Sequence, residues 1–170
     1  MFKKHQNQSM ALGAIAVALL VSAVSVAQNV ADRDAKEINN YVLTEAALAK
    51  YTQAVHNLAP LMKNLPGACD DSEDARSLND AVARMDAIPA AKAAIRSAGL
   101  TTREYVVFTW SMFQNGVAAW SLDQPGGKLP PGTLMGNVNF YRAHDAALRK
   151  LGKELKAADC DDEDRTDESD

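Results

Sequence analysis

Histidine and cysteine are scarce in this chain, which has three of the first and two of the second among 170 residues. These few residues form none of the clusters that bind zinc, and no CxxCH pair attaches a haem covalently. A glycine-rich phosphate loop, a nucleophile elbow and an HExxH helix are missing as well. We therefore expect a protein that is not an enzyme and that carries no cofactor.

Basic residues are never concentrated in one segment. The chain has 18 Lys and Arg against 22 Asp and Glu, and its net charge is −4. Eight acidic residues and one basic residue fall in 159–170, so the rest of the chain is nearly neutral. Nucleic-acid binding needs a concentrated basic face, and we expect no nucleic-acid partner. Residues 159–170 are predicted to be an acidic disordered tail, because so polar a segment cannot bury itself.

Charge is missing altogether from residues 10–26, MALGAIAVALLVSAVSV. Lysines precede this run and small residues end it, which is the order found in a secretory signal peptide. We predict that residues 1–27 are such a peptide, cut after Ala27, and that the protein is periplasmic or secreted. The run falls short of the roughly 20 residues that span a bilayer, so we expect no stable membrane insertion after cleavage. An uncleaved anchor is the alternative.

Strand-like alternation is also rare, whereas apolar residues recur at steps of three and four, as they do in helices. The pattern predicts main helices over residues 44–62, 89–98, 101–122 and 137–157, and a short one over 74–86. The fold class is therefore all-α, an antiparallel helical bundle of four main helices plus a short extra helix. Residues 28–158 would form this single domain.

The ends of these helices carry specific signals. Thr101 and Glu104 have the spacing of a capping box, in which each side chain binds a free backbone amide of the first turn. Pro89 is a favoured first residue of a helix and Gly99 a favoured residue just past an end. Pro60 is expected to kink its helix or end it early, because proline has no backbone N–H to donate.

The longest charge-free stretch after the signal peptide is residues 105–122, YVVFTWSMFQNGVAAWSL. On a helix its apolar side chains cover a wide arc and leave a polar strip at Ser111, Gln114 and Asn115. So wide an arc is typical of a central helix contacted from several sides, and we expect it to build the core. A membrane span is the alternative, although polar residues interrupt the stretch.

Gly116 lies in the middle of this arc, where glycine costs about 1 kcal/mol relative to alanine. One interpretation is a close crossing with another helix. The other is an apolar pocket for a lipid or another apolar ligand, which Met112, Phe113 and Trp120 would line around the missing side chain.

Cys69 and Cys160 stand in similar contexts, CDDSED and CDDEDR. An oxidising destination favours a disulfide between them, although two separate thiols or pairing between chains remain open. A disulfide would gather acidic residues into a candidate Ca²⁺ site, or they only solubilise the chain and complement a helix dipole. The weak metal candidates are Asp70, Asp71, Asp161 and Asp162.

His144 lies on the apolar seam of the last predicted helix. A histidine there usually packs in the core, but it could ligate a non-covalent haem together with Met62 or Met112, or bind a metal. The alternative function is therefore a metal- or haem-binding periplasmic bundle protein that uses His144 or the acidic cluster.

The segments YVLTEAALAKY, LTTREYVV and NVNFYRAH resemble a family of small exported all-helical bacterial proteins that is uncharacterised. The resemblance implies export and a helical fold, and it implies no activity and no site residue. We expect a non-catalytic protein that binds an unknown partner protein or a small apolar ligand. The sequence does not indicate its oligomeric state.

Overall fold

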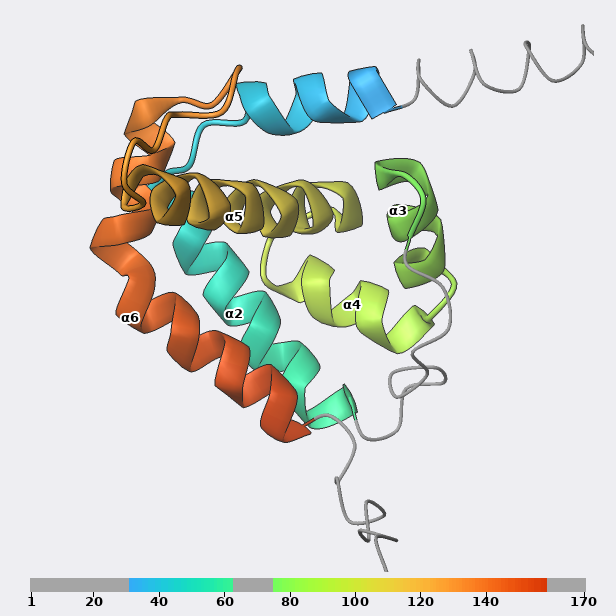
Figure 1. Ribbon diagram of the computed structural model, residues 1–170. Coiled ribbons are helices and arrows are strands. Elements are labelled where there is room, and N and C mark those ends of the chain that lie inside the picture. Colours follow the sequence, from blue (N-terminus) through green and yellow to red (C-terminus); the bar gives the residue numbers. More distant parts are fainter. Residues whose placement is uncertain (1–30, 63–74, 159–170) are drawn as a thin grey trace, which may run out of the picture.

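The computed structural model describes residues 31–62 and 75–158, and this described part is helical without any strand (Figure 1). Residues 31–40 form a first helical stretch, called helix 31–40 below. The helices that follow are α2 (Glu45–Met62), α3 (Leu78–Asp86), α4 (Pro89–Ser97), α5 (Thr102–Leu122) and α6 (Met135–Ala158). The all-α class is confirmed for the described residues.

The predicted capping box at the start of α5 is present. The hydroxyl of Thr101 accepts a hydrogen bond from the Glu104 N–H at 3.1 Å, and the Glu104 carboxylate accepts one from the Thr101 N–H at 2.7 Å. Pro89 is the first residue of α4, and Gly99 follows that helix with a φ of 78°. Pro89 and Gly99 therefore occupy the positions at the start and just past the end of a helix that the sequence predicted.

Pro60 does not end its helix early, and the start of α3 differs from expectation. α2 continues through Pro60 to Met62, because a proline in the last turn removes one backbone bond and leaves few residues to disturb. α3 begins at Leu78 and not near residue 74, since the Ser77 hydroxyl accepts a hydrogen bond from the Asp80 N–H at 3.1 Å. Ser77 is thus the side chain that caps this helix.

α2 and α6 run in the same direction. The Glu45 carboxylate lies 2.7 Å from Nε2 of His144, and the Glu154 carboxylate lies 3.2 Å from Nε2 of His56. The first turn of α2 therefore lies beside the middle of α6, and the later turns of the two helices lie beside each other (Figure 1). α2 and α4 are antiparallel, since Lys50 packs against Gly99 while later residues of α2 contact earlier ones of α4. α3, α4 and α5 provide the long connection that a parallel α2–α6 pair needs.

α5 lies across α2 and α6 and contributes the centre of the core (Figure 1). Phe108 is 1% exposed, and its ring stacks on Tyr51 with centroids 4.5 Å apart. Tyr51 in turn stacks on Tyr105 at 5.2 Å, and burial raises the pKa of both hydroxyls. The seam of α6 joins the same cluster through Leu151.

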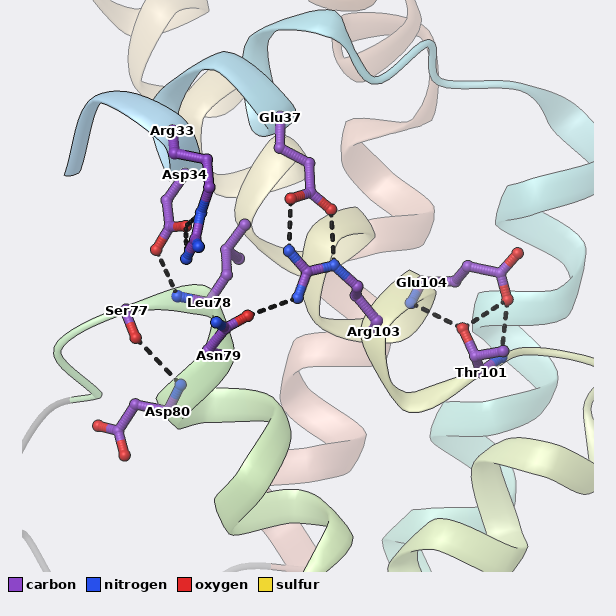
Figure 2. A network of polar contacts seen from close by, with 10 residues as sticks. All are labelled: Arg33, Asp34, Glu37, Ser77, Leu78, Asn79, Asp80, Thr101, Arg103 and Glu104. Atoms are coloured by element: carbon purple, nitrogen blue, oxygen red, sulfur yellow. Dashed lines mark hydrogen bonds and ion pairs between the residues drawn. The ribbon is translucent and has the colours of Figure 1, made fainter. Parts of the chain in front are cut away.

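Helix 31–40 was not predicted, and it packs on α3 and α5 through polar groups (Figure 2). The buried carboxylate of Asp34 accepts a hydrogen bond from the Leu78 N–H at 2.7 Å. The guanidinium of Arg103 donates to both oxygens of Glu37, at 2.8 and 2.5 Å, and to Asn79 at 2.8 Å. Charged contacts of this kind hold the helix where an apolar seam would hold another.

Candidate functional site: the exposed stripe of α5

Helix 31–40 covers the polar strip of α5. Ser111 is fully buried, and its hydroxyl lies 3.4 Å from the Ile38 carbonyl oxygen. The Gln114 amide hydrogen-bonds to the side chain of Asn39. Asn115 is 3% exposed and donates to the Ser111 carbonyl at 2.7 Å, while its own Oδ1 has no partner. The polar residues of this helix therefore face the protein interior.

The consequence is that part of the apolar arc faces solvent. Phe113 is 75% exposed, Trp120 is 65% exposed and Val117 is 46% exposed. These residues lie four and three positions apart, so they form one continuous row on the outside of the helix, which we call the α5 stripe. The expectation that the whole arc builds the core is wrong here, because helix 31–40 turns the opposite side of α5 inward.

The α5 stripe borders an open groove of about 260 Å³. Its lining residues are Phe113, Gly116, Val117, Trp120 and Tyr141. Met112, which the sequence placed in this pocket, is 6% exposed and belongs to the core cluster. Three of the four residues predicted for an apolar pocket are thus brought together, and the sequence missed Tyr141 because that residue comes from α6.

Gly116 of α5 lies directly against Tyr141 of α6 in the groove. A Cβ atom added to Gly116 would lie 2.9 Å from Cζ of Tyr141, which is closer than carbon atoms pack. The glycine therefore makes room for the ring of Tyr141, which lies over it as one wall of the groove. This contact is with a side chain, so it supports the pocket interpretation, and a close crossing of the two helices stays a prediction.

Charged groups on the α6 side of the groove are paired with one another. Arg142 binds Asp123 at 2.6 Å, and Arg149 binds Asp145 at 2.8 Å. The hydrogen bond from Arg149 lowers the pKa of Asp145, while burial raises the pKa of the Tyr141 hydroxyl beside it. These four residues, which we call the rim, carry two charges of each sign, and Asp145 lies beside the Tyr141 hydroxyl.

His144 is engaged in packing between helices. Its Nε2 faces the Glu45 carboxylate at 2.7 Å, and its ring lies against Phe140 with centroids 4.4 Å apart. Among the described residues, no three His, Cys, Asp or Glu side chains form a group that could hold a metal ion. His144 therefore contacts Glu45 and Phe140, and a role as a haem ligand stays a prediction.

The other predicted site residues lie outside the described residues. This applies to both cysteines, and the disulfide between Cys69 and Cys160 stays a prediction. It applies equally to the acidic candidates for a cation, Asp70, Asp71, Asp161 and Asp162, and to the cleavage site after Ala27.

None of the helices in 31–62 and 75–158 is long and apolar enough to cross a membrane. Comparison with models of protein families gave no match, and comparison with curated proteins and with solved structures gave none either. The function of the groove must therefore be argued from its own chemistry.

Proposed function

We propose that this protein is a non-catalytic exported protein, periplasmic or secreted, that binds a partner protein through the α5 stripe. The observation that carries the proposal is the exposure of two large aromatic side chains, Phe113 and Trp120, beside an apolar groove. Contiguous exposed apolar surface marks interaction sites, and tryptophan and other aromatic residues are enriched where binding energy concentrates.

A partner protein fits this surface better than a small apolar ligand does. Small-molecule sites bury most of the ligand in clefts of about 300–1,000 Å³, whereas this groove is open and holds about 260 Å³. A protein partner can cover Phe113 and Trp120 while it inserts one side chain into the groove. The guanidinium groups of Arg142 and Arg149 are each paired with a carboxylate, which fits a binding surface better than a catalytic one.

We also propose how the helices are arranged. α2, α4, α5 and α6 would be the four main helices of one bundle, with α3 as the short extra helix and helix 31–40 as a cover on α5. The antiparallel α2–α4 pair supports this arrangement. The α2–α6 pair is parallel, so the bundle would not be antiparallel throughout. Export would follow cleavage after Ala27.

Trp120 offers a direct test, because the chain has only one other tryptophan, the half-buried Trp110. In a Trp110→Phe background and at submicromolar protein concentration, 1-anilinonaphthalene-8-sulfonate should bind at the groove and quench Trp120 by energy transfer. Phe113→Glu and Val117→Glu should remove most of this quenching, because each places a charge in the apolar surface.

Val42 provides the matched control, since it is also exposed, at 61%, but lies before α2 and outside the groove. Val42→Glu should leave the quenching of Trp120 unchanged. Equal quenching in all variants, or none in the parent protein, would show that the α5 stripe does not bind apolar groups.

A further inference from the structure

We infer that the partner on the α5 stripe is a second copy of this chain, with its own α5 antiparallel to the first. The inference rests on the proposed function, because it names the occupant of the same surface. It follows from the order of residues along the stripe, from the charge of α5 and from the area of the exposed side chains.

The stripe is nearly symmetric about its centre. Phe113 lies one helical turn before Val117 and Trp120 lies one turn after it. If a two-fold axis passes near Val117, each Phe113 meets the Trp120 of the other copy, and the two Val117 side chains meet each other. A self-complementary surface of this kind suits the isologous interfaces of two-fold dimers.

The exposed aromatic rings and the groove also lie on the same face of the protein. The rings of Phe113 and Trp120 project into solvent, and the groove beside them reaches to Tyr141. In the antiparallel arrangement an aromatic ring of one copy can enter the groove of the other, and the reverse contact forms at the same time. Offset or edge-to-face contacts between such rings add to the binding that apolar area provides.

The charges permit self-association. α5 has no charged residue from Tyr105 to Leu122, so two copies can lie side by side without repulsion of like charges. The rim pairs, Asp123 with Arg142 and Asp145 with Arg149, present both signs. A foreign partner is usually selected by complementary charge, and this balanced rim favours no single sign.

The exposed area of the α5 stripe limits the affinity of the dimer. Aromatic side chains bury roughly 150–250 Å² each, so Phe113, Val117 and Trp120 offer on the order of 350 Å² per copy at their observed exposure. A standard interface needs about 800 Å² per partner, and these three side chains offer less than half of that area. We therefore expect a weak dimer that forms at micromolar concentration.

Sedimentation velocity over a range of concentrations tests the inference on the purified full-length product. The protein should shift from monomer to dimer, and Val117→Glu should raise the dissociation constant about 100-fold, as loss of a central contact does. Val42→Glu should dimerise like the parent. A monomer at every concentration, or a Val117→Glu protein that dimerises normally, would overturn the inference.

The orientation is tested by a photo-crosslinker, p-benzoylphenylalanine, placed at position 113. Unlabelled crosslinker protein is mixed with ¹⁵N-labelled parent chains, so that only crosslinks between copies join light and heavy peptides. The antiparallel pairing predicts crosslinks to Trp120 and its neighbours, located by fragmentation of the joined peptides, and crosslinks to the residues next to Phe113 would contradict it. If the protein is monomeric yet the quenching of Trp120 depends on Phe113, the proposed function is supported and the inferred dimer is excluded.

Discussion

At the scale of single residues, Gly116 and Tyr141 shape the groove together. The glycine leaves room for the tyrosine ring, whose Cζ, Cε2 and hydroxyl oxygen would all lie about 3 Å from an added Cβ. Tyr141 is only half-buried, so its ring can move toward solvent if the space is taken. The wall of the groove then moves with it.

A double-mutant cycle can measure this coupling. Gly116→Ala gains about 1 kcal/mol of helix propensity but displaces Tyr141, so we expect little or no gain in the free energy of unfolding. In a Tyr141→Ala background the same substitution should stabilise the protein by nearly the whole of that amount. Urea unfolding of the four proteins gives the interaction energy, which we expect to be about 1 kcal/mol. Additive effects would mean that the ring does not pack on Gly116.

At the scale of elements, the first turn of α5 fixes one end of the helix that carries the stripe (Figure 2). Hydrogen bonds from the Thr101 N–H and hydroxyl lower the pKa of the Glu104 carboxyl below its usual 4.5, and Lys50 lowers it further. A carboxyl whose pKa is lower in the folded than in the unfolded chain stabilises the fold at neutral pH. That contribution is lost as the pH falls from the unfolded value through the folded one.

The capping box therefore predicts part of the acid sensitivity. The free energy of unfolding of the parent protein should fall as the pH drops below about 4.5, and Glu104→Gln should show a smaller fall over the same range. The comparison is made by urea unfolding at neutral and at acid pH, with Asp123→Asn as the control, because Asp123 lies on the exposed rim at the other end of α5. A parallel pH dependence of Glu104→Gln and the parent would contradict the assignment.

Sequence patterns located most elements because their signals are local. The capping box of α5 depends on two residues three positions apart, and the start of α4 depends on Pro89. Helix 31–40 has no such signal, since its only large apolar residue is Ile38, and its polar side chains bind a backbone N–H of α3 and the guanidinium of Arg103 on α5, far along the chain. Because helix 31–40 was not predicted, the side of α5 that it covers was also unknown. The apolar side of α5 was therefore expected to be buried throughout, although part of it faces solvent.

At the scale of the whole molecule, the parallel α2–α6 pair brings two distant parts of the chain to one end. The contact of His56 with Glu154 places the last turns of these helices beside each other. Cys69 follows the end of α2 by seven residues, and Cys160 follows the end of α6 by two. An extended chain reaches up to about 3.5 Å per residue, so the lengths of chain after the two helices are compatible with a disulfide between Cys69 and Cys160, which stays a prediction.

The disulfide and the cleavage can be tested together by the intact mass of the protein from its native host. We expect the mass of residues 28–170 less two hydrogens, as a single chain on a non-reducing gel. A disulfide that closes about 90 residues should add about 4 kcal/mol to the free energy of unfolding, and reduction should remove it. Cys69→Ser should match the reduced parent and respond no further to reductant. A covalent dimer on the gel, or a stability that reduction leaves unchanged, would exclude the bond within the chain, and the α2–α6 contact would then hold that end of the molecule alone.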